Sequence, residues 1–343
     1  MNGPTAASAP TANRQRRLLL TTLAGLGIAA SAGVAQATRR LINPCRAALP
    51  ASLVENEWVQ TAWQGVDAAL FLDCHVHLIG TGDSDSGIEV NPRLSSLWHP
   101  LRYAQRLFYL NAGCVHDAPG QIDRSYVERL RNLIDGLPAG AGVLLFAFDR
   151  FHHPDGRADT QRSTFYTPNA YAQRIAARHP GVFAWAASIH PYRPDAVEAL
   201  QAAVAGGACA VKWLPPAMGI DPSSVQCDRF YAALAAHDLP LITHAGEEQA
   251  VDGGDTQAYG NPLRLRRALD HGVRVVVAHC ATTGSAADLD RGAHGPERTC
   301  FELFARLMDE SPYHDRLFGD ISALTLRNRD PATLATLLER KDW

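Results

Sequence analysis

The chain has 343 residues, of which 46% are hydrophobic, and a formal net charge of -3 at pH 7. This length and hydrophobic content can bury a sizeable core, as in a soluble enzyme domain. The slightly negative charge provides no excess of basic residues for a nucleic-acid surface, so we do not expect DNA or RNA as a partner.

Residues 1–37 have the order of an export signal. Arg16 and Arg17 precede the uncharged stretch 18–37, which ends in Ala35-Gln36-Ala37. A basic region, an apolar region and a small-residue cleavage site are typical of a signal peptide, and the paired arginines resemble a twin-arginine signal. We therefore expect an exported, periplasmic protein. The alternative is an uncleaved membrane anchor, because roughly 20 apolar residues can span a bilayer.

After an expected linker at 38–63, residues 68–77 predict a buried strand that ends in histidines. An apolar run leads directly into Asp73-Cys74-His75-Val76-His77. Because side chains alternate along a strand, we expect Asp73, His75 and His77 on one face and Cys74 on the other, toward a layer of helices. Two imidazoles at this spacing can bind one metal ion, with Asp73 close enough to orient them. Alone, this motif is weak evidence.

A long connection, residues 78–121, follows the first strand and includes an aromatic-rich helix expected at 101–110. A connection of this length on the active face is usually a lid or a specificity element. The alternative is an inserted helix packed on the outside of the domain.

Downstream, strands and helices alternate. We expect strands at 142–149, 182–190, 209–213, 239–244, 273–279 and 317–322, and helices at 125–135, 168–178, 194–205, 227–237, 262–271, 301–310 and 331–341. This alternation is typical of a parallel sheet with helical crossovers. Polar residues collect at or just beyond the carboxyl ends of the strands, where such folds place their active sites: Arg150, His190, Lys212, His244, His279 and Asp320.

In combination these motifs resemble the amidohydrolase superfamily, specifically its amidohydrolase-related (amidohydrolase 2) branch. The resemblance is carried by Asp73-x-His75-x-His77, Thr243-His244-Ala245-Gly246, Ala278-His279-Cys280 and Gly319-Asp320-Ile321-Ser322-Ala323. It implies an α/β fold of the TIM (β/α)8 type over residues 64–343, with a divalent metal at the mouth of the barrel.

The sequence supplies seven of the eight βα units that this resemblance implies. Family members carry a metal-binding Asp at the end of strand eight, and the sequence contains no matching segment after 331–341. We therefore expect a C-terminal truncation, an incomplete barrel and a chain that is inactive as given.

The resemblance also implies roles for individual residues. His75, His77 and His244 are expected to bind the metal, with Zn²⁺ as the expected ion. His279, one strand further on, is expected to deprotonate or orient a water molecule, since imidazole titrates near neutral pH.

Four polar residues keep open alternatives. Lys212 is a carboxylated bridge in binuclear relatives and no ligand in mononuclear ones, and the branch favours the mononuclear arrangement. Asp320 can replace the missing carboxylate ligand, but the resemblance favours a substrate or outer-shell contact. His190 and Arg150 can hold a substrate carboxylate or carbonyl; either can instead cap a helix or pair with an acid.

Three functions are consistent with these residues. The first is a metal-dependent hydrolase that uses an activated water on an amide, ester or lactone-like carbonyl. The second is a metal-dependent nonoxidative decarboxylase, which requires basic groups placed for a carboxylate. The third is an inactive binding chain, if truncation has removed a ligand. The expected partner is a small carbonyl or carboxylate compound, with membrane contact only through residues 18–37 if these are retained.

Overall fold

A computed structural model describes residues 43, 45, 50–115, 119–326 and 329–343. The chain divides into two units, residues 1–46 and 47–343, and the fold below is that of the second unit. The expected signal or anchor at 1–37 lies outside the described residues and stays a prediction. Among the residues that are described, no helix has the length and apolar character needed to cross a membrane. Part of the expected linker is helical, in α2 (Ala51–Val54) and α3 (Glu57–Trp63).

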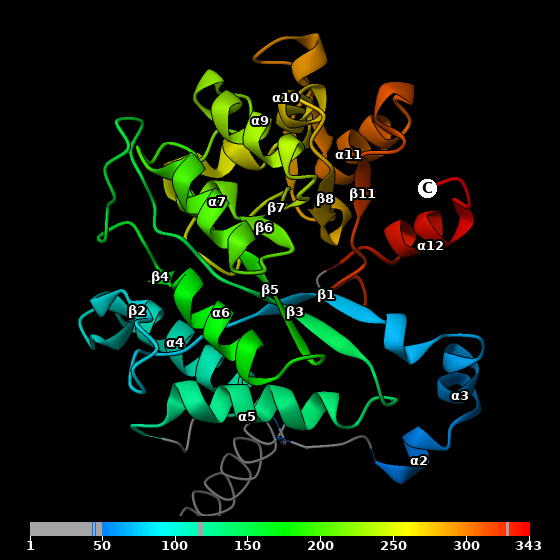
Figure 1. The fold of residues 1–343 in the computed structure, drawn as a ribbon. Coiled ribbons are helices and arrows are strands. Elements are labelled where there is room, and N and C mark those ends of the chain that lie inside the picture. The colour runs from blue at the N-terminus through cyan, green and yellow to red at the C-terminus, as the bar shows by residue number, and fades with distance from the viewer. Residues whose placement is uncertain (1–42, 44, 46–49, 116–118, 327–328) are drawn as a thin grey trace, which may run out of the picture. The chain divides into compact units, whose positions relative to one another are not determined.

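Seven parallel strands form one curled sheet (Figure 1), in the order β1-β3-β5-β6-β7-β8-β11. All seven expected strands are present, each shorter than predicted, so the structure confirms a TIM-type architecture with seven βα units. Their bounds are β1 (Leu72–His77), β3 (Gly142–Phe146), β5 (Phe183–Ala187), β6 (Ala210–Trp213), β7 (Leu241–His244), β8 (Val275–Ala278) and β11 (Leu317–Gly319).

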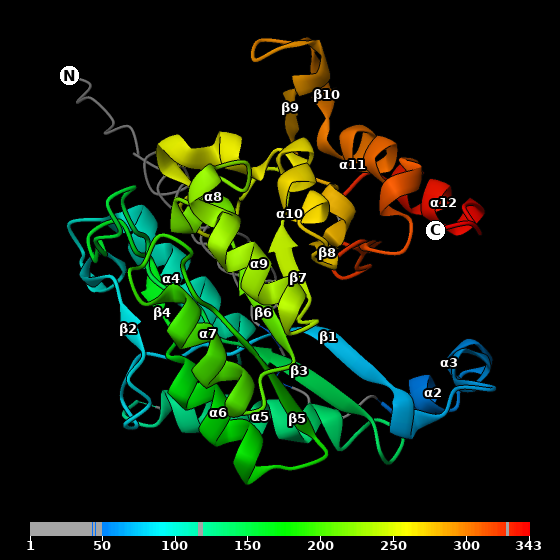
Figure 2. The same cartoon turned by 45° about the horizontal axis from the view of Figure 1, so that its top comes forward.

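Helices follow the strands and cover the outer side of the sheet (Figure 2). They are α5 (Ile122–Ile134), α6 (Asn169–Arg178), α7 (Ala196–Ala205), α9 (Asp228–Ala236), α10 (Arg266–Asp270), α11 (Cys300–Met308) and α12 (Pro331–Glu339). The predicted helix at 262–271 begins as a 3-10 turn, Pro262–Leu265, before α10. A proline has no backbone N–H to donate, which suits the first turn of such a segment.

Shorter elements lie in the connections between the main strands and helices. The 78–121 connection contains β2 (Glu89–Val90), the 3-10 turn η2 (Pro92–Ser95) and α4 (Pro100–Ala112), and β2 pairs with β4 (Phe165–Tyr166). The others are α8 (Pro215–Met218), the hairpin β9 (Ser285–Ala287) with β10 (Glu297–Thr299), and the 3-10 turns η1 (Ala68–Leu70), η3 (Val225–Cys227), η4 (Gly254–Gly260), η6 (His279–Ala281), η7 (Leu289–Arg291) and η8 (Ser311–Tyr313).

The inner strands, β3 to β8 in the sheet order, are buried on both faces because their side chains alternate between two apolar layers, whereas the edge strands β1 and β11 are partly exposed. In β3, Val143 and Leu145 pack in the large cluster between the sheet and the helices. Leu144 and Phe146 instead join an inner cluster with residues of β5, β6 and β7. Apolar side chains on both faces are characteristic of a parallel sheet that curls around a packed interior.

The first strand departs from the predicted alternation. Its pairing with β3 shifts by one residue between Asp73 and Val76, which is a β-bulge. As a result Cys74 packs against the inner cluster, and the ring of His75 also contacts Phe146 of that cluster, at 5.0 Å between centroids. The expectation that Cys74 faces the helices is therefore wrong, because a bulge resets the face on which the following residues lie.

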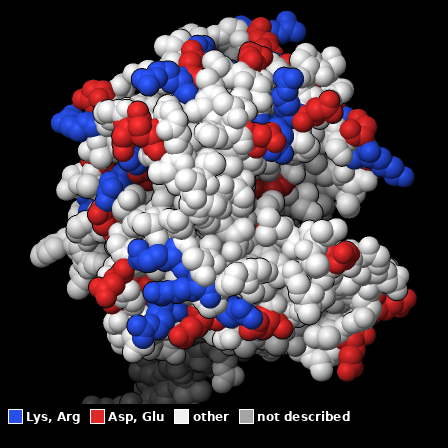
Figure 3. Space-filling view, in the orientation of Figure 1, with Lys and Arg blue, Asp and Glu red and all other residues white. Residues whose placement is uncertain are grey.

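Basic and acidic side chains are interspersed on the face seen in Figure 3, around a broad uncharged surface. Several opposite charges pair between elements, for example Arg266 with Asp290 and with Glu310, each at 2.5 Å. A nucleic-acid surface requires a clustered basic patch. The expectation that nucleic acid is not a partner stays a prediction.

Candidate metal centre

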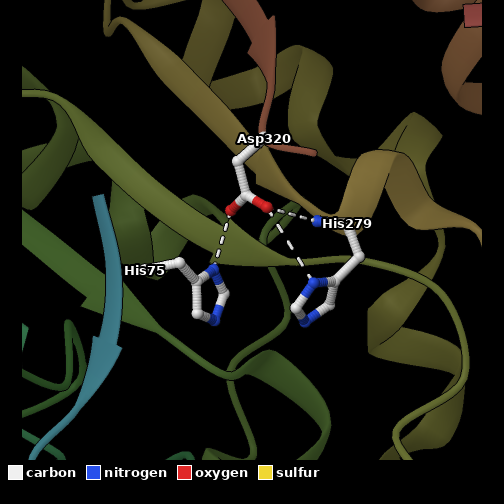
Figure 4. A group of neighbouring side chains, drawn as sticks. All are labelled: His75, His279 and Asp320. Carbon is white, nitrogen blue, oxygen red and sulfur yellow. Dashed lines mark hydrogen bonds and ion pairs between the residues drawn. The ribbon is translucent and has the colours of Figure 1, made fainter. Parts of the chain in front are cut away.

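Four histidines and one aspartate converge at the carboxyl ends of β1, β7, β8 and β11. The ring of His279 lies 4.6 Å from that of His75 and 6.0 Å from that of His244, between centroids. Asp320 faces both His75 and His279 (Figure 4). The fifth member, His77, adjoins His75. The structure thus brings His75, His77, His279 and Asp320 together, with the His244 ring next to that of His279. Among the described residues, the group of three whose ligand atoms all lie within 4.8 Å of one another is His75, His279 and Asp320.

His75 and His77 direct the same type of nitrogen toward one point. Their Nε2 atoms lie 3.3 Å apart. Two nitrogens bound to one ion at about 2.0–2.1 Å lie roughly 3.0–3.4 Å from each other, so this spacing fits shared coordination. The Nδ1 atom of His75 donates to Asp320 Oδ2 at 2.7 Å, so Nε2 is the unprotonated nitrogen, and its lone pair is free to bind a metal. Burial also lowers the pKa of His75, which keeps the ring neutral, the form that binds a metal.

Asp320 is saturated by hydrogen bonds. The His75 ring donates to Oδ2. The backbone N–H groups of His279 and Ser322 donate to Oδ1, each at 3.0 Å. The Ser322 hydroxyl also donates to Oδ1. The hydrogen bond from His75 and its proximity lower the pKa of the carboxyl group despite burial, so it is ionised. A carboxylate that orients a metal-binding imidazole is the usual outer-shell arrangement. The geometry therefore favours orientation of His75 over direct ligation, although the carboxylate lies within a compact group with His75 and His279.

His279 opens a strained turn. His279, Cys280 and Ala281 have φ angles of 56°, 49° and 53°, a left-handed conformation that costs about 1–2 kcal/mol per non-glycine residue. The hydrogen bonds from the His279 N–H and the Cys280 thiol to Asp320 stabilise this turn. The His279 ring donates from Nδ1 to the Ser322 carbonyl at 3.0 Å, so Nε2 is its basic nitrogen. Burial and the neighbouring His75 lower its pKa to about 4.

His244 has an unsatisfied nitrogen. Its buried Nε2 has no hydrogen-bond partner among the described residues, and its closest carboxylate oxygen is Glu248 Oε2, at 3.6 Å. Burial and the nearby Lys212 lower the pKa of His244 to about 3, so the ring is neutral. A buried polar atom without a partner costs free energy. A metal ion is one group that would satisfy it.

Lys212 lies in the interior without a carboxylate partner. Its side chain is buried on β6, and Nζ lies 4.7 Å from the centre of the Phe146 ring. None of the described acidic residues lies within ion-pair distance of it. Burial lowers the pKa of Lys212 to about 8. An amine of this pKa is partly neutral at neutral pH, which is compatible with either predicted role.

The remaining predicted residues lie elsewhere or act differently. Asp73 accepts from the backbone N–H of His75 at 3.0 Å, so the carboxylate at the His75 ring is Asp320. His190 is enclosed, with Nε2 donating to the Met218 carbonyl at 2.9 Å. Arg150 pairs with Glu89 at 2.5 Å and covers the Tyr166 ring. Of the roles considered for Arg150, the structure shows the pairing with an acidic residue.

Sequence reasoning missed Glu248. This carboxylate is 5% exposed and lies beside His244, four residues on in the chain. Its Oε1 accepts from the backbone N–H groups of Ala250 and Val251 at 2.7 and 2.8 Å, and burial raises its pKa. The sequence does place a Glu four residues after His244, the last residue of β7. Whether the side chain of such a residue points toward His244 depends on the conformation of the loop, which the sequence alone does not give.

The donor set fits a divalent transition metal. Two facing Nε2 atoms, a third imidazole with a buried unsatisfied nitrogen, and a carboxylate holding one ring are the elements of such a site. His75 and His77 would hold the ion, and the assignment of His244 as the third ligand stays a prediction. His279 adjoins His75, and Glu248 adjoins His244.

Comparisons with known proteins identify the family of this chain. The family model described as Amidohydrolase matches residues 72–339. A comparison with curated proteins gives no match.

Solved structures with this type of fold include both hydrolases and decarboxylases. A probable 2-pyrone-4,6-dicarboxylic acid hydrolase from Acinetobacter baumannii with citric acid bound is 12% identical, with a TM-score of 0.43 over 78% of this chain and 76% of that one. A 2,6-dihydroxybenzoate decarboxylase complexed with 2,6-dihydroxybenzoate is 13% identical, with a TM-score of 0.41 over 80% and 84%. A 5-carboxyvanillate decarboxylase from Novosphingobium aromaticivorans with bound manganese is 15% identical, with a TM-score of 0.36 over 62% and 66%. These likenesses are too distant to indicate a reaction.

The family match covers more than half of the chain and includes every strand of the sheet. This protein therefore belongs to the metal-dependent amidohydrolase family.

Proposed function

We propose that this protein is a metal-dependent hydrolase that uses an activated water on an amide, ester or lactone-like carbonyl. The observation that carries the proposal is the pair of Nε2 atoms of His75 and His77, 3.3 Å apart, together with the unsatisfied Nε2 of His244, whose ring lies 6.0 Å from that of His279. A divalent ion held there supplies Lewis-acid polarisation of a carbonyl and lowers the pKa of a bound water toward neutrality.

Two residues around these histidines have separate roles: Asp320 positions other groups, and His279 accepts a proton. Asp320 holds the His75 ring and the strained backbone of His279 with one carboxylate. Because Ser322 occupies Nδ1 of His279, Nε2 is the atom that takes a proton from the attacking water. The lowered pKa of His279 means that this nitrogen is unprotonated at neutral pH and ready to act as a base.

A nonoxidative decarboxylase is the second candidate. It is supported by two cations close to the site, Lys212 and Arg329, of which Arg329 donates to Thr282 Oγ1 at 2.9 Å and retains a buried Nε without a partner. Basic groups in such positions can bind a substrate carboxylate. Arg150, which the sequence singled out for this role, is engaged by Glu89.

Zn²⁺ is the proposed ion, because three imidazoles with an open position are typical of catalytic zinc. Imidazole also suits other first-row metals, and one solved structure of similar fold contains manganese. Metal analysis by inductively coupled plasma spectrometry after purification in unsupplemented medium distinguishes these ions.

The test of function is a metal-dependent turnover assay. Protein stripped with a chelator and reloaded with Zn²⁺ or Mn²⁺ is assayed against panels of aryl esters, lactones and amides, and in parallel against aromatic carboxylates with detection of CO₂. Metal-dependent hydrolysis that is lost in His75→Ala supports the proposal. CO₂ release without hydrolysis selects the decarboxylase, and turnover that is equal with and without metal contradicts both.

We also propose export through the twin-arginine route, on the basis of residues 1–37. Arg16→Lys together with Arg17→Lys should prevent appearance of the protein in a periplasmic fraction. Unchanged export of this variant would indicate the general secretory route or an anchor.

A further inference from the structure

An apolar cavity opens beside the metal-binding pair. It has a volume of about 220 Å³, and His77 forms part of its wall. An apolar cavity of about 150 Å³ is sufficient to hold a benzene ring. The remaining wall comes mainly from the 78–121 connection and from β4 and the loop after β7, with apolar side chains from Ile88, Val90, Leu110, Val115, Phe165 and Val251.

The polar groups of the wall are turned toward protein partners. The Tyr126 hydroxyl donates to the His77 carbonyl at 2.7 Å, and the Tyr109 hydroxyl donates to the Ala250 carbonyl. The Thr81 N–H donates to the buried carboxylate of Asp123 at 2.5 Å. These bonds leave hydrocarbon and ring faces toward the cavity, and they connect its wall to the backbone of the ligand His77.

One cation lines this cavity. Arg106, on α4, is half-buried and makes no hydrogen bond or ion pair with any other residue in the described part of the chain, whereas its neighbour Arg102 pairs with Asp252. Among the described residues, no acidic side chain lines the cavity. An unpaired guanidinium at an apolar wall can bind one carboxylate, and the described part of the wall contains no second Lys or Arg for another.

We infer that this cavity holds the apolar part of the substrate, and that the substrate is a compound with a hydrocarbon or aromatic body and a single anionic group paired with Arg106. The inference rests on the proposed function, since it takes the reacting carbonyl to lie at His75 and His77. It makes α4 a specificity element and not an external decoration.

The test uses straight-chain monocarboxylates from butanoate to octanoate as probes, titrated by calorimetry into the 343-residue protein with metal. Burial of each added methylene should tighten binding about three- to fourfold until the cavity is filled. In chelator-stripped protein, where no metal ion at His77 can pair with it, the second carboxylate of adipate would be buried without a cation, so adipate should bind at least about tenfold more weakly than hexanoate. Equal affinities across the series, or for hexanoate and adipate, would overturn the inference.

Two variants and a control locate the effect. Arg106→Gln should weaken hexanoate binding about tenfold and leave 1-hexanol binding unchanged. Ala250→Phe, which narrows the cavity, should remove the dependence on chain length. The control is Arg124→Gln, an exposed arginine on α5 outside the cavity wall, which should change neither. An Arg106→Gln protein that binds hexanoate as tightly as the Arg124→Gln protein contradicts the role of Arg106.

Repeating the series on chelator-stripped protein separates this inference from the proposed function. Because the wall consists of protein, the chain-length dependence should persist without metal, even if the metal-loaded enzyme hydrolyses none of the tested carbonyl compounds. Metal-dependent hydrolysis together with no chain-length dependence would leave the proposed function standing and overturn the cavity assignment.

Discussion

This protein contains two groups of packed histidines, and they differ in what their nitrogens contact. His75 and His279 lie 4.6 Å apart between ring centroids, and His152 and His190 lie at the same distance. His190 is enclosed by backbone: Nε2 contacts the Met218 carbonyl at 2.9 Å, and Nδ1 accepts from the Tyr192 N–H. In the first group, by contrast, Nε2 atoms face each other or have no partner. Burial and ring proximity occur in both, so the unsatisfied nitrogens are what mark the metal centre.

Each group also has its own aspartate. Asp320 receives the His75 ring, whereas Asp149 receives the backbone N–H of His190 at 2.9 Å and Arg193 at 3.0 Å. Asp149 therefore stabilises the backbone of its loop and does not orient an imidazole. The contrast predicts that equivalent substitutions in the two groups have different consequences.

The largest expected effect is loss of the metal. His75→Ala, His77→Ala or His244→Ala should each reduce bound metal from about one ion per chain to less than about a tenth, because each removes a ligand. His190→Asn is the matched substitution in the other group and should retain the metal. The measurement is metal content after gel filtration. Unchanged content in all three alanine variants would break the distinction between the groups.

The next effect concerns catalysis. His279→Asn should lower turnover about 10²- to 10⁴-fold with near-normal metal content, because it removes the proposed proton acceptor and keeps a side chain near Ser322. Steady-state rates and metal content are measured on the same preparation. A parallel loss of both would indicate that His279 is itself a ligand, and would favour a binuclear arrangement involving Lys212.

A smaller effect is expected at the aspartates. Asp320→Asn should weaken metal affinity or turnover about 10- to 100-fold, as is usual for carboxylates that orient metal-binding histidines. Asp149→Asn should lower the melting temperature without changing metal affinity. Competition titration with a chromophoric chelator gives the affinities. Equal affinities in the two variants would show that the Asp320–His75 contact does not contribute to the site.

The smallest effect is the dependence of stability on pH in metal-free protein. The pKa values of His279 and His244 are lowered to about 4 and about 3, so between about pH 6.5 and pH 4 the unfolded chain binds more protons than the folded one. The free energy of unfolding should therefore fall as the pH is lowered through this window, by at most about 1.4 kcal/mol per pH unit for each imidazole.

Urea unfolding at pH 7, 6 and 5 measures this slope. His244→Gln should have a shallower slope than the wild type, because its share of the proton uptake is removed. His190, whose pKa burial also lowers, remains in that variant and keeps part of the slope. Identical slopes for wild type and His244→Gln would contradict the assignment of a buried, neutral His244.

The amino-acid sequence by itself determined the order of strands and helices, the seven parallel strands and the strand ends that carry the site. Alternation of apolar runs with amphipathic segments is a local property, so it can be read along the chain. It also led us to propose His75, His77, His244 and His279 as site residues, because the carboxyl ends of parallel strands meet at one edge of the sheet.

Only the tertiary structure decided which polar groups act on one another. In β1, which contains a bulge, Cys74 packs against the inner cluster. The ring of His75 forms its hydrogen bond with Asp320 and not with Asp73. Glu248 lies beside His244 because of a loop conformation that the Glu248 carboxylate itself stabilises by a hydrogen bond. Arg150 forms an ion pair with Glu89 of β2. Such contacts join segments far apart in sequence or depend on the conformation of a loop. They follow from the packing of the whole chain, and no local pattern of residues specifies them.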